Sequence, residues 1–400
     1  MAAALEIAGR VARGLAPRRL PLGETLGLRL AEEVVSGVDS PPFDKSLVDG
    51  FAVTSADRAA TLRITELVTA GAVPTQAVAP GCTIRVMTGA PIPQGADAVV
   101  KWEDCTQIDD ETIRSPADRA KAGACILRRG AAFQAGQVVL AAGKRLTALD
   151  IALLAEIGEA HVLVHPRPRV GVLATGDELG PAEGPLAAGQ IRNSNGPMLV
   201  AAVATAGAEP LDLGVARDDP ADLRAKIAAG LDQCDVLLVS GGVSAGVKDL
   251  APGIFRELGV VEHFHQVRMK PGKPLWFGSR DAGARRVLVF GLPGNPVSTF
   301  VSFKLFVEPA LEALAGGGPL AAKSGEGTYP ITAPFSHRGK RPTFHPCRRA
   351  PGDVKSPRVE LLDWKGSADI ATLTKADGLA ALREGDYELA PGDGVEVIWL

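Results

Sequence analysis

The sequence predicts a multidomain protein of the α/β plus β class, with a central doubly wound α/β domain, a β-rich insertion domain and a small C-terminal β-barrel. Three observations support this prediction. The 400 residues exceed what one hydrophobic core usually organises. Strand and helix patterns alternate after about residue 167, which is typical of a parallel sheet. Short β-branched runs separated by turn residues occupy long stretches before and after this region.

The N-terminal stretch predicts two helices, Leu5 to Leu15, which ends before Pro17, and Leu22 to Val35. The chain beyond them should be extended, because paired prolines cannot continue a helix. Asp44 and Asp49 then flank a short turn that ends at a glycine. Two carboxylates at this spacing are more typical of a loop in a functional site than of a loop that only connects two elements.

The stretch from Ala52 to about Ala135 predicts an all-β insertion, because its β-branched runs are short and bounded by turn residues. It contains a loop with two prolines and two glycines, TGAPIPQG, which Thr88 opens with a hydroxyl group. Arg128 and Arg129 precede a glycine. Such a pair is more often a solvated edge, but it can also clamp a phosphate.

The central region begins with a predicted helix and strand and a proline-rich hinge, Pro166 to Pro168, which we interpret as a domain boundary. Further along, the pattern predicts strands at Val170–Ala174, Leu211–Val215 and Val236–Val239, around Val267, and at Val287–Phe290. Helices are predicted at Ala148–Ile157, Pro197–Ala206, Ala221–Leu231 and Leu250–Leu258, and up to about Ala315. Gly316 to Pro319 is a linker by composition, and the alternating runs beyond it predict the C-terminal β domain.

The stretch VLLVSGGVSAGVKD, from Val236 to Asp249, predicts a buried strand that ends in a loop of small residues. Ligands of open α/β sheets bind outside the carboxyl ends of the strands, and glycines such as Gly241 and Gly242 let backbone N–H groups approach a phosphate. The alternative is a tight strand-to-helix turn that binds nothing.

The composition limits the classes of function. A net charge of −3 argues against a protein that coats nucleic acid or an anionic membrane. The N-terminus has no long uncharged apolar run, so neither a signal peptide nor a membrane span is predicted. The five cysteines lack CxxC spacing and fit a reducing cytoplasm as small buried side chains. His263 and His265 share one face of a strand, and we expect an interior or edge pair rather than half a metal site.

Acidic and basic side chains gather at the predicted strand ends. The acids are Asp177, Glu178, Asp218 and Asp249, and the bases are Lys270 and Lys273 on a proline-braced loop. Carboxylates at one rim repel one another unless a cation lies among them, and Mg²⁺ prefers such oxygens. Lysines suit phosphate or another oxyanion. The pattern therefore predicts a metal-assisted site for a phosphorylated ligand, although Asp218 could equally be a helix N-cap.

Seven motifs in order resemble the molybdopterin molybdenumtransferase (MoeA) family: PPFDKSLVDGFA, MTGAPIPQGADAVV, TGDEL, GQIRNSN, SGGVSAGVKD, MKPGKP and GLPGNPVS. The resemblance implies a cytoplasmic homodimer whose subunits have four domains. They would comprise residues 16–36 with 136–166 (connecting domain I), 37–135 (β-rich domain II), 1–15 with 167–318 (α/β molybdopterin-binding domain III) and 319–400 (β-barrel domain IV). The implied reaction is Mg²⁺-dependent insertion of molybdate into adenylylated molybdopterin, with release of AMP. The adenylyltransferase that acts upstream becomes a candidate partner.

The resemblance also implies roles for individual residues. The implied catalytic residues are Asp49, Glu178, Asp218, Asp249, Lys270 and Lys273, and three of these acids, Asp49, Glu178 and Asp249, would bind the metal. The implied substrate-binding residues are Thr88, Gly241, Gly242, Ser244, Pro293 and Pro296. Ser367 is a further candidate contact, from its position in a Gly/Ser loop of the C-terminal domain. Because Asp49 comes from the β-rich side, the family's dimer implies a site completed between subunits.

The chain departs from the family pattern at four positions: Lys45 replaces an asparagine, Val48 a methionine, and Ala132 and Val247 stand where acids are usual. These changes imply altered oxyanion affinity, tungstate use or a paralogue of weakened activity. Two other functions remain open at this point. One is a molybdopterin adenylyltransferase, against which the β insertion and the C-terminal β domain argue. The other is a non-catalytic scaffold, against which the retained acids and lysines argue.

Overall fold

The computed structural model describes residues 1–116, 121–243, 250–283, 285–318, 327–352 and 357–400. Ser244, Val247 and Asp249 therefore lie outside the described residues. The chain divides into two compact units. The larger unit comprises Met1–Leu20, Thr25–Ala31 and Leu163–Leu400, and the smaller unit comprises Pro21–Glu24 and Glu32–Val162. The four domain boundaries predicted from the family resemblance remain predictions.

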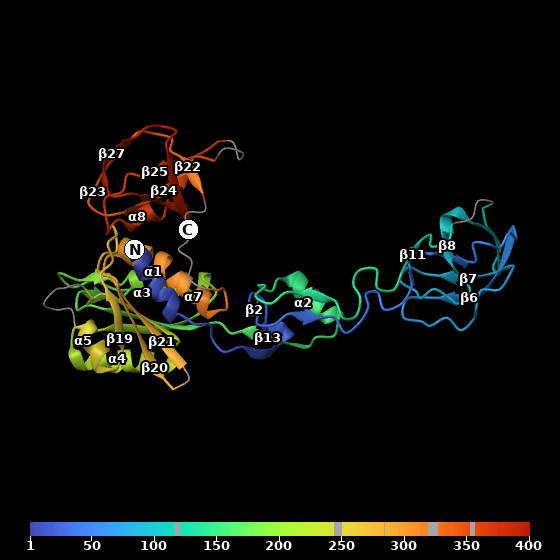
Figure 1. The fold of residues 1–400 in the computed structure, drawn as a ribbon, viewed down its shortest axis with the longest axis horizontal. Coiled ribbons are helices and arrows are strands. Elements are labelled where there is room, and N and C mark those ends of the chain that lie inside the picture. The colour runs from blue at the N-terminus through green and yellow to red at the C-terminus, as the bar shows by residue number, and fades with distance from the viewer. Residues whose placement is uncertain (117–120, 244–249, 284, 319–326, 353–356) are drawn as a thin grey trace. The chain divides into compact units, whose positions relative to one another are not determined.

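The smaller unit is β-rich, as predicted (Figure 1). Its main sheet has six strands in the order β8-β5-β7-β6-β10-β9. Their bounds are Ala98–Lys101, Gly50–Val53, Cys82–Val86, Thr61–Val68, Thr112–Arg114 and Thr106–Asp109. The two faces of strand β5 belong to two cores, because Phe51 and Val53 pack in one cluster and Ala52 in another. This alternation is what the two-residue period of a strand requires.

The described residues of the smaller unit also include two short strand pairs, one α-helix and the 3₁₀ turn η2 (Trp102–Asp104). Strand β4 (Lys45–Ser46) pairs with β11 (Ile126–Leu127), and β3 (Val34–Val35) pairs with β12 (Val138–Leu140). Helix α2 (Ala148–Glu156) was predicted within one residue of its end, and a capping box of Thr147 and Asp150 starts it.

The helix predicted from Leu22 to Val35 is wrong. Leu22–Glu24 forms a single 3₁₀ turn (η1), and the chain continues as the short strands β2 (Arg29–Leu30) and β3. Gly27 has a φ of 78°, which a helix cannot contain. Strand β2 pairs with β13 (His161–His165), so long-range pairing overrides the local preference of the leucine and glutamate residues. Strand β1 (Arg18–Pro21) precedes the turn.

The larger unit contains a six-stranded sheet in the order β17-β14-β18-β21-β20-β19. Their bounds are Glu209–Ala216, Arg169–Thr175, Val236–Ser240, Arg285–Leu292, Trp276–Ala282 and Val261–His265. The first four strands are parallel, as predicted, and β20 and β19 are antiparallel. The strand predicted around Val267 is observed as β19 but ends two residues earlier. Val267 follows it in a loop, where its N–H group donates to the carbonyl of Lys273 at 2.8 Å.

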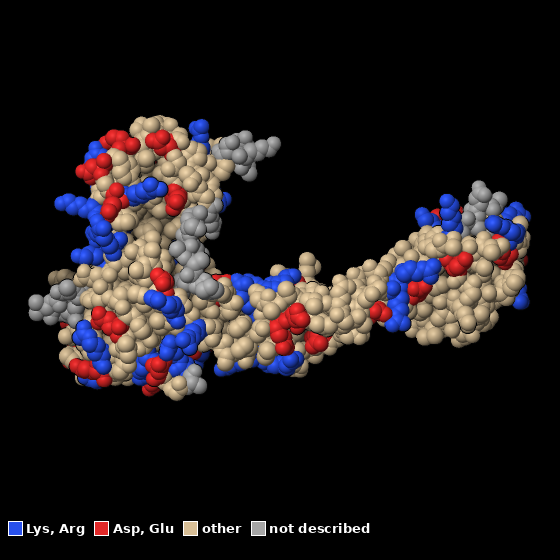
Figure 2. All heavy atoms as spheres, viewed as in Figure 1, with Lys and Arg blue, Asp and Glu red and all other residues tan. Residues whose placement is uncertain are grey.

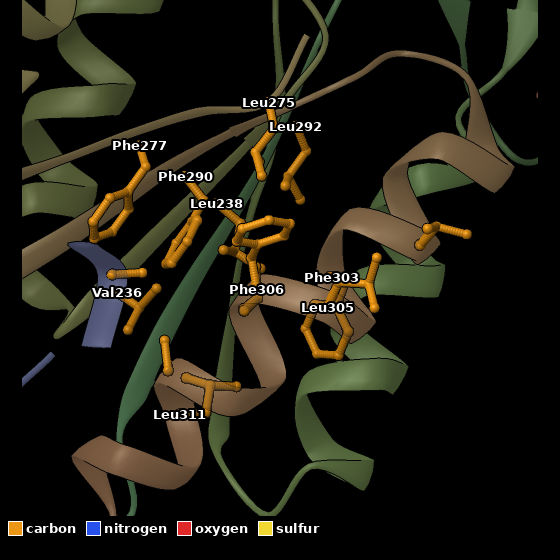
Figure 3. Packing of buried hydrophobic residues seen from close by; sticks show 14 of the residues in the cluster. Val236, Leu238, Leu275, Phe277, Phe290, Leu292, Phe303, Leu305, Phe306 and Leu311 are labelled. Atoms are coloured by element: carbon orange, nitrogen blue, oxygen red, sulfur yellow. The ribbon is translucent and has the colours of Figure 1, made fainter. Parts of the chain in front are cut away.

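Helices cover both faces of this sheet, which confirms the doubly wound prediction. On one face Val236 and Leu238 pack with α1, α3, α6, η3 and α7, whose bounds are Ala2–Val11, Asn195–Thr205, Pro296–Ser302, Phe303–Val307 (a π-helical turn) and Glu308–Leu314. Figure 3 shows Phe306 of η3 beside Phe290 and Leu238 of the sheet. On the other face Leu237 and Val239 pack with α4 (Pro220–Gln233) and α5 (Ala251–Glu257).

The C-terminal part is a small β domain, as predicted. Five strands form a sheet in the order β22-β28-β26-β24-β25, with the bounds Thr328–Pro330, Gly394–Trp399, Gly378–Leu382, Thr343–Arg349 and Val359–Leu361. Strands β23 (Phe335–Gly339) and β27 (Gly385–Leu389) pair beside it, and α8 spans Ile370–Leu373. Among the described residues, no helix has the length and apolar character that crossing a membrane requires.

Candidate functional site

Parallel strands bring four loops to one edge of the sheet. Strands β17, β14, β18 and β21 end at Ala216, Thr175, Ser240 and Leu292. The residues after these ends were selected from sequence as site residues, and the register places them together: Thr175 pairs with Ala216, and Ser240 pairs with Leu292. This edge is the position where ligands bind in open α/β sheets.

The acidic loops at this edge hold each other in place. The Asp218 carboxylate accepts a hydrogen bond from the Thr175 hydroxyl at 3.2 Å and one from the Asp177 N–H at 3.4 Å. In return, the Asp218 N–H donates to the Asp177 carboxylate at 3.1 Å. The N-cap of α4 is Asp219, which accepts from Ala221 and Asp222, so the N-cap interpretation of Asp218 is wrong. Asp218 instead joins the ends of two neighbouring strands.

Glycines allow these loops to approach closely. Gly241 has a φ of 97°, and a Cβ atom there would lie 2.5 Å from the carbonyl oxygen of Thr175. A Cβ at Gly176, whose φ is 148°, would lie 2.5 Å from a carboxylate oxygen of Glu178. Side chains at either position would therefore push β14 and β18 apart or displace Glu178, whose own side chain is exposed.

Asn195 is a residue of this edge that was not selected from the sequence. Its amide nitrogen donates to the Ser240 hydroxyl at 2.8 Å and to the Gly294 carbonyl at 2.7 Å. Its Oδ1 is buried without a hydrogen-bond partner among the described residues. Asn195 begins α3 in the motif IRNSN, so its position at a helix start was the available signal. Its partners lie 45 and 99 residues away, which no local pattern reveals.

The proline loop after β21 is bound to both the α/β and the C-terminal parts. The carbonyl of Pro293 accepts hydrogen bonds from the hydroxyl groups of Ser240 and Thr299, and Pro296 begins α6. Ser367 of the C-terminal domain accepts from the Asn295 side chain at 3.0 Å through its hydroxyl and from the Val297 N–H at 3.1 Å through its carbonyl. The structure thus places Pro293, Pro296 and Ser367 in one contact region.

The two lysines lie on the loop between β19 and β20. Both side chains are exposed, and within the described part of the chain neither forms an ion pair. The Lys270 N–H donates to the Pro342 carbonyl, and the Lys270 carbonyl accepts from the Phe344 N–H, both at 2.8 Å. The C-terminal domain therefore fixes the backbone that carries one of the two expected oxyanion-binding groups.

In the smaller unit the structure brings Asp49 and Thr88 together. The N–H and the hydroxyl of Thr88 both donate to one Asp49 oxygen at 2.7 Å. The backbone hydrogen bond is the main cause that holds the pKa of Asp49 below its ordinary value, followed by the hydroxyl, with a further contribution from the Arg85 charge. Asp49 is therefore an ionised carboxylate on an exposed turn.

The arginine pair of the smaller unit has carboxylate partners. Arg128 donates to Asp44 at 2.5 Å, the Arg129 backbone N–H donates to Asp44 at 2.8 Å, and the Arg129 side chain donates to Asp39 at 2.5 Å. These contacts favour the interpretation as a structural edge over a phosphate clamp.

Two of the departures from the family pattern lie in this unit. Lys45 belongs to β4 and is half-buried. The Ala132 N–H donates to the Ser40 carbonyl at 2.9 Å.

The other candidate metal ligands have ordinary partners. His263 Nε2 lies 2.8 Å from the Ser279 hydroxyl, and His265 Nε2 lies 3.0 Å from the Val243 carbonyl. Both are half-buried on the edge strand β19, so of the predicted interior or edge pair the edge form is observed. The prediction of small buried cysteines holds for Cys234 and Cys347, whereas Cys82, Cys105 and Cys125 are only partly buried. Burial raises the pKa of Cys347 to about 12, which leaves it an unreactive thiol. Within the described ranges, no group of three or more His, Cys, Asp or Glu side chains is arranged to hold a metal.

Three family models match the chain. The MoeA N-terminal region (domain I and II) matches residues 1–158, a probable molybdopterin binding domain matches residues 171–313, and the MoeA C-terminal region (domain IV) matches residues 328–400.

A Synechococcus elongatus protein named molybdopterin molybdenumtransferase is 35% identical over 393 residues, covering 96% of this chain and 94% of that protein. A Bacillus subtilis protein of the same name is 39% identical over 301 residues, covering 73% and 69%. Among solved structures, a molybdopterin biosynthesis MoeA protein from Pyrococcus horikoshii is 32% identical with a TM-score of 0.81, covering 100% of this chain and 98% of that one.

Proposed function

The chain belongs to the MoeA family, and from this membership we propose that it is a molybdopterin molybdenumtransferase of molybdenum cofactor biosynthesis. It would insert molybdate into adenylylated molybdopterin and release AMP. The observation that carries this proposal is similarity over nearly the whole chain to a protein of that name. The strand-end arrangement supports it. Close-packed glycines and two lysines without ion-pair partners among the described residues suit an anionic ligand, and the acidic loops suit a cation bound beside it.

We assign the roles as follows. Lys270 and Lys273 bind the phosphate and molybdate oxygens, and Asp218 keeps the acidic loops in register through its contacts with Thr175 and Asp177. Gly241, Gly242 and Ser244 would bind the phosphate, as the family resemblance implies. Pro293, Pro296 and Ser367 shape the pterin–nucleotide pocket, while Thr88 keeps Asp49 ionised.

Mg²⁺ is the proposed cofactor, held by Asp49, Glu178 and Asp249. Carboxylate oxygens are the donors that Mg²⁺ prefers, and the exposed Glu178 and the ionised Asp49 fit that chemistry. The ion would neutralise charge on the phosphate and molybdate oxygens. Magnesium dependence of AMP release, measured against a chelator and against manganese, tests this assignment.

The decisive experiment supplies the purified chain with adenylylated molybdopterin, molybdate and Mg²⁺. We expect AMP release that depends on molybdate and the appearance of a pterin product able to activate an apo-molybdoenzyme. Replacing molybdate with tungstate in the same assay measures the oxyanion preference. The departures from the family pattern at Lys45 and Ala132 imply that this preference is altered. A chain that releases no AMP under any of these conditions contradicts the proposal.

The two alternatives make different predictions. Family membership does not favour an adenylyltransferase, which would convert ATP and molybdopterin to adenylylated molybdopterin unaided. A non-catalytic scaffold would tolerate Asp49→Ala, whereas we expect that variant to lose cofactor production in a deficient strain. The purified chain tests the first alternative, and complementation of the deficient strain tests the second.

We further propose a cytoplasmic homodimer that receives its substrate from the upstream adenylyltransferase. Light scattering measures the oligomeric state, and co-purification with the adenylyltransferase measures the partner contact. If the site is completed between subunits, mixing the inactive Asp49→Ala and Lys273→Met variants should restore part of the activity.

A further inference from the structure

Backbone contacts hold the loop that carries Lys270 in place. Its backbone forms a bridge with Thr343 of strand β24, flanked by the hydrogen bonds to Pro342 and Phe344. Gly272, two residues later, packs so closely that a Cβ atom there would lie 2.5 Å from the Met269 methyl and 2.7 Å from the Ser302 hydroxyl. The position of the Cα atom of Lys270 is therefore fixed, and only the direction of its long side chain remains to be set.

A chain of aromatic contacts in the C-terminal domain reaches the end of that side chain. The Lys270 ammonium lies 5.9 Å from the centre of the Trp364 ring, within the range of a cation–π contact. Trp364 packs edge-to-face against His345, with ring centres 5.6 Å apart at 87°, and His345 packs in the same manner against Phe335 at 4.9 Å. His345 is buried, and its Nε2–H donates to the Leu362 carbonyl at 2.7 Å. The ring of Trp364 is thus supported from within the domain.

The aromatic neighbours add no negative charge. Burial lowers the pKa values of His337 and His345, and the Lys270 charge lowers both further, so both histidines are neutral near pH 7. The indole nitrogen of Trp364 is buried and has no hydrogen-bond partner among the described residues. The ring therefore contacts its surroundings by packing and through its π face.

We propose that Trp364 is a positioning residue for Lys270: its ring face orients the ammonium group without neutralising it, so that the group stays available to an oxyanion. A carboxylate in the same place would fix the side chain equally well but would cancel its charge. This inference rests on the proposed function, because that function assigns oxyanion binding to Lys270.

The first test measures molybdate binding by calorimetry with four forms of the full chain. We expect Trp364→Leu to weaken binding roughly threefold to tenfold, and Trp364→Phe, which keeps an aromatic face, to weaken it less than about threefold. The matched control is Trp399→Leu in the same domain, since Trp399 also lies under a cation, Arg349, at 4.4 Å. Equal weakening by Trp364→Leu and Trp399→Leu, or none by Trp364→Leu, overturns the proposal.

The second test reports the contact itself and needs no turnover. The chain has four tryptophans, so labelling with 5-fluorotryptophan gives few ¹⁹F resonances, and Trp364→Phe assigns one of them. We expect Lys270→Met to shift the Trp364 resonance and not that of Trp399, and Arg349→Met to do the reverse. An unchanged Trp364 resonance in Lys270→Met overturns the proposal. A chain that shows the expected shifts and molybdate binding but releases no AMP contradicts the proposed function while supporting the role of Trp364.

Discussion

Two basic loops, one in each unit, differ in how their positive charges are paired. In the smaller unit Arg128 and Arg129 bond to Asp44 and Asp39, so the charges on this loop cancel. In the larger unit Lys270 and Lys273 have no ion-pair partner among the described residues, and the Lys270 ammonium lies over the ring of Trp364.

This difference separates cations that stabilise a loop from cations that can bind an anion. On the face drawn in Figure 2, acidic and basic side chains are interspersed, which fits the small net charge. Affinity for a phosphate or molybdate group must then come from a few local charges that lack counter-ions. The lysine loop meets that condition, whereas the arginine loop would first have to break its own ion pairs.

The largest expected effect comes from removing an unpaired cation. Lys273→Met should lower the rate of molybdate-dependent AMP release about 100-fold, the usual consequence of losing one charged donor in a preorganised site. Arg129→Met is the matched control, because it removes an exposed cation that already has a partner. We expect less than about a twofold change in that variant. Equal losses in both would show that the pairing of the arginines does not exclude them from the site.

The second prediction compares the glycines that shape the two loops. Gly272 and Gly130 have φ values of 101° and 69°, so alanine is strained at both. At Gly272 the new methyl group would meet buried Met269 and Ser302, whereas at Gly130 the nearest atom, 3.1 Å away, belongs to the exposed side chain of Gln134.

Gly272→Ala should therefore lower the free energy of unfolding by about 2–4 kcal/mol and Gly130→Ala by about 1 kcal/mol. Denaturant melts of both variants measure the difference. Equal losses would mean that backbone strain alone determines the cost, and that the lysine loop is no more tightly packed than the arginine loop.

The strength of the sequence patterns explains which parts were predictable. Continuous apolar runs such as Val236–Val239 mark strands buried on both faces, and the structure buries all four of these residues. Leu22 to Val35 was misassigned because its apolar residues fit a helix locally, while its strands depend on partners more than a hundred residues away. The site shows the same limit. The predicted strand ends located Asp177 and Asp218. Asp218 and Asp219 are adjacent in the sequence, so the pattern could not tell which of them is the N-cap of α4. Asn195 is linked to the site only through Ser240 and Gly294, which are distant in the sequence.

The third prediction concerns the neutral histidines near the lysine loop. Burial lowers the pKa of His345, so the unfolded chain binds a proton at a pH where the folded chain does not. Stability should therefore fall as the pH drops below about 6.5, by at most about 1.4 kcal/mol per pH unit for this group. His345→Gln should weaken that dependence, as seen in urea melts at pH 5 and pH 7. The exposed His161 provides the control: if His161→Gln has the same effect, burial of His345 is not the cause.

The smallest effect should come from the paired arginines. The Arg129 backbone N–H is the main cause that lowers the pKa of Asp44, and the Arg128 side chain lowers it further. A lowered carboxyl pKa adds stability above the unfolded value of about 3.9, and this stability disappears as the pH falls through the folded pKa. Arg128→Met should move the pKa of Asp44 part of the way back, because the backbone donor remains. An NMR titration of the Asp44 carboxyl carbon measures the shift. An unchanged pKa would mean that Arg128 does not hold Asp44 in solution and is itself free to bind an anion.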